Sequence, residues 1–292
     1  MMIRINKPDY DQNEVVENCI TNMRKDERLK RILSSQDSIV LGSAEYDILA
    51  KGEQLSSIMV HDIVVGGVTK DDMTWLYDNK FAKEGQGGRK YYDAIKLLPP
   101  FGTCPYCGQR KVSTLDHYLP KAMYPTYAIA TNNLVASCYE CNRVKGSPEI
   151  LKRSDETIHP YYDDFNDGVW IKAKVIEKEP IGFEFYVDKP VNWNDEKFTR
   201  AQNHFTTFKL NQLYISHASE LYSEYLYKLK ELYNTGKDSL VKYDIIDRIK
   251  EARRLRLNTW KAAMYTALLD SQWFLNLYLP KQSKKPIDND GF

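Results

Sequence analysis

Two pairs of cysteines, each with the spacing Cys-X-X-Cys, carry the clearest chemical signal in the sequence. They are Cys104, Cys107, Cys138 and Cys141. A Cys-X-X-Cys turn directs both sulfur atoms to the same side, so two such turns can enclose a tetrahedral zinc ion. Because four thiolates fill all four positions around zinc, such an ion would be structural and would do no chemistry of its own.

Side chains suited to acid–base chemistry and to metal binding lie inside the loop between the two cysteine pairs and directly after it. Asp116 and His117 are adjacent within the loop, and Asn142 follows the last cysteine. A histidine can act as a general base near neutral pH, while carboxylate and amide oxygens are hard ligands suited to Mg²⁺. In an extended strand Asp116 and His117 would face opposite sides, so both could serve one phosphate only if the strand twists or ends there. This set of residues suits hydrolysis of a phosphodiester bond.

Two stretches of sequence, Cys104 to Lys121 and Asn132 to Lys145, resemble the two halves of the HNH endonuclease motif, the ββα-metal fold. They contain, in order, a first cysteine pair, Asp-His, a central Asn-Leu, a second cysteine pair and a closing Asn. The resemblance covers about fifty residues of the chain.

The resemblance implies a role for each matching residue. His117 would be the general base, and Asp116 with Asn142 would hold one Mg²⁺ or Mn²⁺ ion. Asn133 would orient the imidazole through a backbone link. Many members of the family have histidine where this chain has Asn142; asparagine keeps an oxygen ligand, which favours Mg²⁺ or Mn²⁺ over softer metals.

Three further residues near the motif are candidates for substrate binding. Lys121 and Lys145 suit contacts with phosphate, although each is equally well explained as a solvated lysine. His159 could contact phosphate or donate a hydrogen bond, or it could stabilise the transition into the following strands. The other histidines, His61, His204 and His217, are expected to be structural, and Cys19 is expected to be a small buried residue.

The chain of 292 residues has a formal net charge of +1, with 42% hydrophobic and 28% charged residues. These values are ordinary for a soluble protein, so any nucleic-acid surface must come from local clustering. The stretch from Cys104 to Arg153 is clustered in this way. Its seven basic residues are Arg110, Lys111, Lys121, Arg143, Lys145, Lys152 and Arg153, against three acidic ones, Asp116, Glu140 and Glu149.

The sequence shows no signal peptide and no long apolar run, so we expect a cytosolic location and no membrane association. In the reducing cytosol the cysteine pattern favours metal ligation over disulfides.

Hydrophobic periodicity predicts mainly helices around the motif. Helices are expected at 14–33, from Asp71 onward, at 89–95, and through 195–279 with a break at Gly236 and an end at Pro280; a strand pair is expected at 169–175 and 182–187. The segment 38–68 has a mixed pattern. We therefore expect an α+β fold with a predominantly helical frame around a central zinc-containing ββα module. The predicted domains are an N-terminal helical region (1–98), the nuclease module (99–165) and a strand pair with C-terminal helices (166–292).

The order of these parts resembles the HNH proteins of bacterial antiphage cassettes such as Septu. The resemblance rests on Gly87-Gly88-Arg89, the motif, His159-Pro160-Tyr161 and the helical C-terminal region. It implies an ABC-type ATPase as partner, which the helices after Asp195 would contact. The basic run from Arg248 to Arg256 is expected to be a solvated helix face, or alternatively a surface for nucleic acid or a protein.

DNA is the expected substrate of such an endonuclease. Two alternatives remain open on the sequence. One is an RNA nuclease of the same fold, for example one that cleaves tRNA. The other is a zinc-containing binding module without catalytic activity, in which Asp116 and His117 would be an ordinary surface pair.

Overall fold

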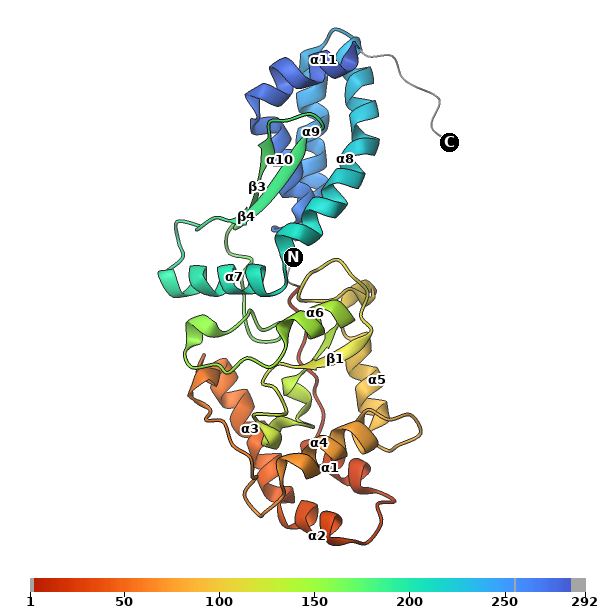
Figure 1. Ribbon diagram of the computed structural model, residues 1–292, viewed down its shortest axis with the longest axis vertical. Coiled ribbons are helices and arrows are strands. Elements are labelled where there is room, and N and C mark those ends of the chain that lie inside the picture. Colours follow the sequence, from red (N-terminus) through yellow and green to blue (C-terminus); the bar gives the residue numbers. More distant parts are fainter. Residues whose placement is uncertain (1–2, 255, 285–292) are drawn as a thin grey trace. The chain divides into compact units, whose positions relative to one another are not determined.

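The computed structural model describes residues 3–254 and 256–284. The protein is mainly helical and contains two small antiparallel sheets of two strands each (Figure 1). Its internal contacts divide the described residues into two units. The larger unit comprises 3–164 and 199–208, and the smaller comprises the remaining described residues from 165 onward.

The larger unit holds all the residues of the motif. Its helices and strands are α1 (Gln12–Ile20), α2 (Glu27–Ser34), α3 (Gln36–Lys51), α4 (Lys70–Leu76), the π-helix η2 (Tyr77–Phe81), α5 (Arg89–Leu97), β1 (Thr114–His117), β2 (Leu134–Ser137), α6 (Tyr139–Lys145) and the second part of α7 (Asp195–Thr207). Single turns of 3₁₀-helix lie at Leu55–Ser57, Pro100–Gly102, Pro125–Tyr127, Thr131–Asn133 and Arg153–Asp155.

The first predicted helix, 14–33, is wrong, because the structure has two helices in its place. Asn22 adopts a left-handed conformation with φ of 60° and ends the first of them. The carboxylate of Asp26 then accepts a hydrogen bond from the backbone N–H of Leu29 and caps the second. Apolar residues recur at helical spacing on both sides of this turn, so the sequence pattern did not indicate the break between the two helices.

Helix α3 occupies much of the segment whose pattern was mixed. Its buried positions include Ile39, Ser43, Tyr46 and Ala50, which follow helical spacing. Because small and polar residues fill part of the buried face, hydropathy alone did not reveal the helix. By contrast, the helix predicted from Asp71 is confirmed: Thr69 and Asp72 form a capping box at the start of α4.

The core of the larger unit joins the N-terminal helices to the β1–β2 hairpin. Buried residues from α1, α3, α4, α5 and both strands form one hydrophobic cluster; they include Val15, Val16, Cys19, Ile39, Leu76, Ile95, Leu115, Leu134 and Ala136. Cys19 is completely buried, and burial raises the pKa of its thiol to about 12. The helices before the motif therefore support the hairpin directly.

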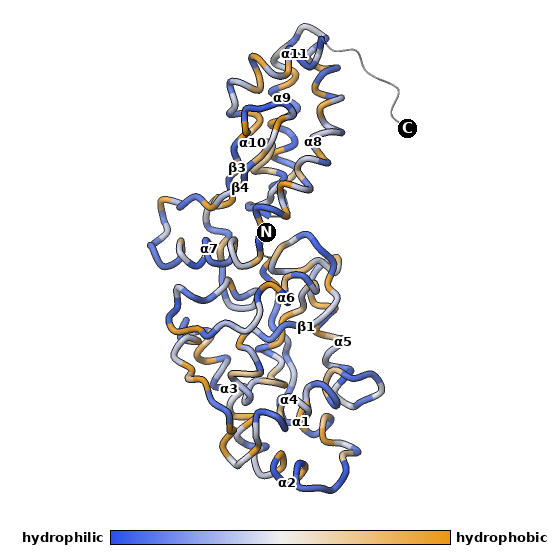
Figure 2. The backbone as a smooth tube through the Cα atoms, viewed as in Figure 1, coloured by the Kyte–Doolittle hydropathy of each residue, from blue (hydrophilic) through white to orange (hydrophobic). Residues whose placement is uncertain are grey.

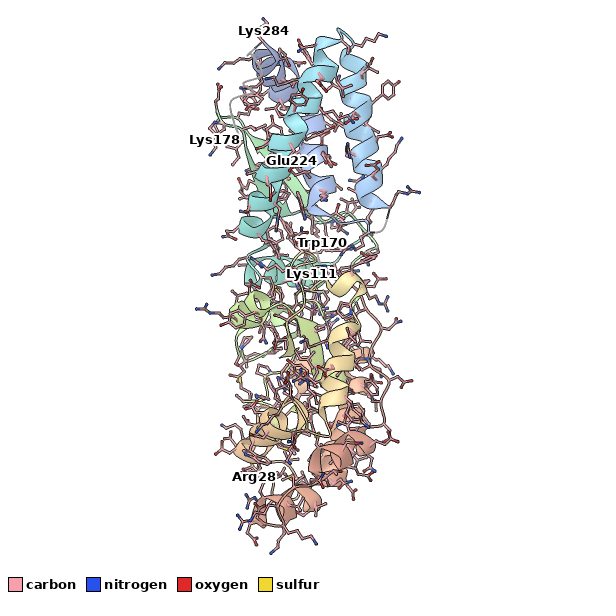
Figure 3. All side chains as sticks on the ribbon, turned by 90° about the vertical axis from the view of Figure 1, so that its right-hand side faces the viewer. Arg28, Lys111, Trp170, Lys178, Glu224 and Lys284 are labelled. Atoms are coloured by element: carbon pink, nitrogen blue, oxygen red, sulfur yellow. The ribbon has the colours of Figure 1, made fainter. Side chains whose placement is uncertain are left out.

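The smaller unit packs a hairpin against helices. It contains β3 (Ile171–Ile176), β4 (Gly182–Val187), the first residues of α7, and α8 (Leu210–Asn234), α9 (Asp238–Arg253), α10 (Trp260–Asp270), the π-helix η7 (Phe274–Tyr278) and α11 (Leu279–Ser283). The predicted strand pair is confirmed, with Ile171 opposite Val187. Trp170, labelled in Figure 3, lies buried just before β3. The apolar stretches of these elements alternate with hydrophilic ones along the backbone (Figure 2).

Pro280 does not end the last helix as predicted. It is the second residue of α11, which follows the π-helix η7 directly, so the helical backbone continues past the proline to Ser283. None of the described helices combines the length and the apolar character needed to cross a membrane.

Candidate functional site

The four cysteines of the two pairs lie together and are buried. Their sulfur atoms lie within 4.8 Å of one another. In the first turn the N–H of Arg110 donates to Sγ of Cys107 (3.4 Å); in the second, the N–H of Cys141 donates to Sγ of Cys138 (3.4 Å). Such N–H groups stabilise negative charge on sulfur. The four side chains can therefore bind a metal ion, and an all-sulfur set of four ligands suits zinc.

The cysteine cluster fixes a hairpin followed by a helix. Strands β1 and β2 pair antiparallel, with Asp116 opposite Val135 and His117 opposite Leu134. Cys138 follows β2 directly and is the N-cap of α6. Helix α6 packs on β1, so Asp116, His117 and Asn142 lie on neighbouring elements (Figure 1).

Asp116 faces the interior of the larger unit and is only 3% exposed. Its Oδ2 accepts a hydrogen bond from the Tyr106 hydroxyl (2.7 Å) and lies 3.0 Å from Nζ of Lys145. Burial raises the pKa of the Asp116 carboxyl, while the Lys145 ammonium and the Tyr106 hydroxyl oppose that shift. The carboxylate is thus held in a buried ion pair.

His117 is the last residue of β1, and its ring has contacts different from those of Asp116. Its Nε2–H donates to the carbonyl of Ala128 (2.8 Å), since a carbonyl can only accept. Nδ1 therefore carries the lone pair, and it makes no hydrogen bond with the described residues. Burial, with help from the Lys121 charge, lowers the pKa of the ring to about 3. The imidazole is therefore neutral at neutral pH, and its Nδ1 can accept a hydrogen bond, but in this conformation the ring is a weaker base than a free imidazole.

The side chain of Asn133 stabilises the loop whose backbone is hydrogen-bonded to His117. Its Oδ1 accepts from the N–H of Leu119 (2.7 Å), and its Nδ2 donates to the carbonyls of Leu119 (3.0 Å) and Tyr127 (3.1 Å). Tyr127 immediately precedes Ala128, whose carbonyl holds the imidazole. Asn133 makes no hydrogen bond to His117 itself but fixes backbone next to the carbonyl that does, and its role in orienting the imidazole stays a prediction.

Asn142 and Lys145 face β1 from the same side of α6. The amide of Asn142 donates to the carbonyl of Leu115 (3.2 Å), which leaves its oxygen as a possible metal ligand. Lys145 donates to the carbonyl of His117 (2.7 Å) as well as pairing with Asp116. The donor chemistry of Asp116 and Asn142 suits Mg²⁺, but the Lys145 ammonium already neutralises the Asp116 carboxylate. A divalent ion at Asp116 would have to share that carboxylate with Lys145 or displace it.

The N-terminal helices supply a residue that the sequence did not reveal. The ring of Tyr77, in the π-helix after α4, packs edge-on against His117 with 4.4 Å between the ring centroids. Lys121 lies over the same tyrosine ring, with Nζ 4.4 Å from its centroid, and forms an ion pair with Asp78. Tyr77 precedes His117 by forty residues in sequence, and no local signal points to it.

His159 lies away from solvent. It is 2% exposed; its Nδ1 accepts from the N–H of Tyr161 (3.2 Å), so Nε2 donates to the hydroxyl of Tyr46 (3.1 Å). Its ring also packs on Tyr118 with 4.1 Å between centroids. Burial lowers the pKa of His159 to about 3. Both ring nitrogens of His159 are hydrogen-bonded to groups inside the protein. The predicted contact of His159 with phosphate stays a prediction.

The other histidines and the basic run have structural surroundings. His204 donates to the carbonyl of Tyr106 (2.9 Å), His61 bonds Thr126 Oγ1 (2.7 Å), and His217 stacks on Trp260. In α9, Arg248 lies near two acidic side chains of its own helix. The contacts of the three histidines match the expectation that they are structural. The basic run is a charged helix face only in part: α9 ends at Arg253, and Arg256 beyond it is partly buried, which lowers the pKa of its guanidinium.

The chain is similar to two proteins of phage and bacterial origin. It is 27% identical over 293 residues to protein ea31 of Escherichia phage lambda, a match that covers 94% of this chain and 99% of that protein. It is 32% identical over 81 residues to the Septu protein PtuB of Bacillus thuringiensis, covering 26% of this chain and 31% of that protein.

No family model and no solved structure matches the chain. The similarity to ea31 extends over nearly the whole of both proteins, so it relates both units to a phage protein. The similarity to PtuB is short and relates only part of the chain to a Septu protein.

Proposed function

We propose that the chain is a metal-dependent endonuclease of the HNH type that hydrolyses phosphodiester bonds of DNA. The observation that carries the proposal is the setting of His117. Its Nε2 is held by the carbonyl of Ala128, Asn133 fixes the loop that carries this carbonyl, and Nδ1 keeps a lone pair. A neutral imidazole held in one orientation suits a general base, and the negative charge of a phosphate bound beside it would raise its lowered pKa toward the working pH.

The proposed step is attack of water on phosphorus. Nδ1 of His117 takes one proton from the water, whose oxygen forms the new bond to phosphorus as the bond to the leaving oxygen breaks. The leaving oxygen takes a proton from solvent. Tyr77 packs against the ring and limits its rotation, and the Lys121 ammonium beside it suits contact with a non-bridging oxygen of the phosphate.

Asp116 and Asn142 would hold Mg²⁺ or Mn²⁺ at the junction of β1 and α6. An ion bound there would stabilise negative charge on the phosphoryl group. Lys145 would then release Asp116, at least in part, and would become available to the substrate. Zinc on the four cysteines would hold the hairpin and α6 in place, and it takes no part in the chemistry.

The similarity to a Septu protein supports a role in antiphage defence. We propose that the protein acts in the cytosol with an ABC-type ATPase, which would contact the helices after Asp195. The similarity to a phage protein over nearly the whole chain supports a role connected with phage infection.

Cleavage of supercoiled plasmid by the purified protein tests the proposal. We expect nicking with Mg²⁺ or Mn²⁺, no cleavage with EDTA, and loss of cleavage by about 10²-fold or more in His117→Ala. His217→Ala is the matched control, because His217 lies in the smaller unit on α8; it should cleave as the wild type does.

The substrate and the partner are tested in the same assay. Cleavage of tRNA but not of plasmid would replace DNA by RNA as the substrate. Undiminished cleavage by His117→Ala would remove His117 from the active site. No cleavage of either substrate, with or without an ATPase partner, would leave a zinc-containing binding module as the function.

A further inference from the structure

A cavity of about 510 Å³ lies in the larger unit, apart from the β1–α6 junction. Seven residues line it: Arg4, Ile5, Asn6, Lys7, Leu98, Pro100 and Tyr161. This volume is within the range of small-molecule sites, about 300–1,000 Å³. None of the seven is acidic, and three carry nitrogen donors.

The N-terminal segment is fixed in a way that directs polar side chains outward. The N–H of Ile3 donates to the carbonyl of Pro105 (2.7 Å), and the N–H of Ile5 donates to the carbonyl of Pro160 (3.0 Å). Ile3 and Ile5 are buried. Because side chains alternate along an extended segment, Arg4 and Asn6 are exposed.

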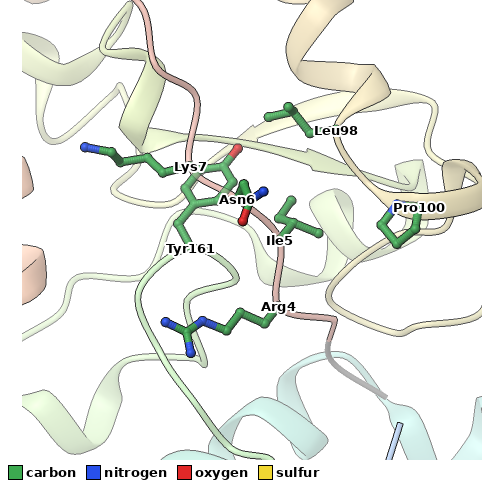
Figure 4. Close-up of a pocket in the computed structure, with 7 residues that line it drawn as sticks. All are labelled: Arg4, Ile5, Asn6, Lys7, Leu98, Pro100 and Tyr161. Atoms are coloured by element: carbon green, nitrogen blue, oxygen red, sulfur yellow. The ribbon is translucent and has the colours of Figure 1, made fainter. Parts of the chain in front are cut away.

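The cavity has a cationic part and an apolar part. Figure 4 shows Arg4 and Lys7 extending to the same side of the N-terminal segment, with Leu98 and Pro100 across it. The apolar part continues onto the surface, where Leu97 and Phe101 are 82% and 81% exposed. Phe101 also has a positive φ of 58°, which is rare for a residue with a side chain.

The two cations can reach a ligand without leaving a buried charge unpaired. The pair of Arg4 with Asp164 is 3.3 Å long and about half exposed on both sides, so it is weak. Lys7 contacts Asp47 (2.6 Å), but Asp47 also pairs with Lys51 and would keep that partner. A phosphate could therefore compete for both cations at low cost.

We propose that this cavity binds a nucleoside phosphate, with the phosphate on Arg4 and Lys7 and the base against the apolar part at Leu98 and Pro100. Guanidinium and ammonium groups suit a phosphate, and the aliphatic side chains of the opposite wall can make apolar contact with the face of a base. The proposal rests on the proposed function in taking the nucleotide to belong to a nucleic-acid strand; a free nucleotide has the same chemistry.

One residue of the cavity wall contacts the strand that pairs with β1. The hydroxyl of Tyr161 donates to the carbonyl of Leu134 (2.5 Å), and Leu134 lies opposite His117 in the β1–β2 ladder. A strand bound in the cavity would contact the protein outside the β1–α6 junction, so it would position the substrate without touching the reacting atoms.

Binding measurements on the full chain test this proposal. The protein carries His117→Ala so that nothing is cleaved, and its affinity is measured for a labelled single-stranded oligonucleotide, for adenosine monophosphate and for inorganic phosphate. Arg4→Gln with Lys7→Met should weaken oligonucleotide binding about tenfold or more. It should also reduce the slope of log K against log salt by about 1.4, from two contacts at about 0.7 each.

The matched control replaces two exposed cations elsewhere in the same unit, Arg24→Gln with Lys25→Met. This variant should keep both the affinity and the salt slope. A second measurement does not depend on any variant at the cavity: an oligonucleotide with 4-thiothymidine should cross-link to the peptide of residues 3–7 or to that of Tyr161.

Each outcome decides the proposal. Loss of oligonucleotide binding assigns the cavity to a strand, and loss of monophosphate binding alone assigns it to a free nucleotide. Unchanged affinity and slope for both ligands, or cross-links only elsewhere, overturn the proposal. If the wild type cleaves no nucleic acid while the double variant still loses binding, the nuclease function fails and the cavity stands.

Discussion

The ammonium of Lys145 and the carboxylate of Asp116 lie 3.0 Å apart, and both side chains are almost inaccessible to water. A buried carboxylate without a cation is costly, so something positive must stay beside Asp116. In the proposed active site either Lys145 or a divalent ion supplies the positive charge beside Asp116. The two cations therefore compete for the Asp116 carboxylate, and this competition should affect the stability of the protein.

Replacement of Lys145 by methionine should therefore destabilise the protein, and Mg²⁺ should restore part of the loss. Breaking a buried ion pair costs about 3–5 kcal/mol, because the remaining charge is left unpaired. We expect this loss in urea denaturation without divalent ions, and a larger stabilisation by Mg²⁺ in the variant than in the wild type. Equal responses to Mg²⁺ would mean that Asp116 does not bind the ion. Lys121→Met, which removes a more exposed lysine, is the control.

Glu156 gives the protein a predictable dependence on pH. Burial raises the pKa of its carboxyl to about 7 from the usual 4.5, although Arg200 and Arg153 oppose that shift. Between these values the folded state binds more protons at Glu156 than the unfolded state does, so the contribution of this carboxyl to stability is fully present below about pH 4.5 and is lost as pH rises to about 7. The loss amounts to about 3 kcal/mol at most.

The test compares Glu156→Gln with the wild type in urea denaturation at pH 5 and pH 7.5. Glutamine has no proton to lose, so the variant should lack this decline and gain stability relative to the wild type at the higher pH. A stability difference between the two proteins that does not change with pH would show that Glu156 titrates near its ordinary value.

At the scale of elements, the two cysteine turns hold the hairpin and α6 together. Cys104→Ser should lower the bound zinc and unfold the region of residues 104–145. In isolated zinc-finger peptides the metal contributes on the order of 10 kcal/mol, more than the spare stability of a typical domain. Metal analysis of the wild type and the variant, with proteolysis to locate the unfolded region, checks this. Absence of zinc from the wild type would contradict it.

The π-helix η2 brings Tyr77 against His117, so its contribution should be specific to the active site. Tyr77→Ala should lower cleavage by roughly 10²-fold, because a displaced base loses its geometry, whereas Tyr77→Phe keeps the ring and should keep most of the activity. Tyr91→Ala is the matched control, since Tyr91 is equally buried in the same unit but contacts Tyr10. If both alanine variants lose stability and activity alike, Tyr77 only supports the fold.

These elements show how far the sequence could be used to predict the site. The cysteines, Asp116, His117 and Asn142 lie within about forty residues, and their turns and strands form locally, so spacing was sufficient to group them. Tyr77 could not be predicted, because its contact depends on how α4 and η2 pack on the hairpin. The pairing of Lys145 with Asp116 also requires the register of α6 on β1, which no spacing specifies.

Some helices and strands were predicted and others were missed, because the sequence shows local signals but not contacts between distant residues. Caps and strong alternation identified α4, β3 and β4, since these signals are local. Helix α3 was missed because part of its buried face is polar: Ser43 is bonded to Asn132 in the interior. A buried polar residue with a distant partner looks exposed in the sequence, and only the fold shows otherwise.

On the scale of the whole molecule, α7 takes part in both units. Residues 195–198 belong to the smaller unit and 199–207 to the larger. In the larger unit Arg200 is 2% exposed, pairs with Asp163, and donates to the carbonyl of Thr157 (3.0 Å). One helix turn further, His204 holds the carbonyl of Tyr106, between the first two cysteines. This part of α7 therefore stabilises the segment after the motif as well as the first cysteine turn.

Arg200→Met should loosen the larger unit and leave the smaller one intact. Asp163 and Glu156 would lose a buried cation, at a cost of about 3–5 kcal/mol, and amide hydrogen exchange should accelerate over residues 156–163 while α8 to α10 keep their protection. Lys197→Met is the matched control on the same helix. Lys197 pairs with Asp167 in the smaller unit and is partly exposed, so its loss should cost less than about 1 kcal/mol and leave 156–163 unchanged. Equal acceleration in α8 to α10 after the Arg200 change would mean that the two units unfold together, and that α7 couples the stability of the site to the C-terminal helices.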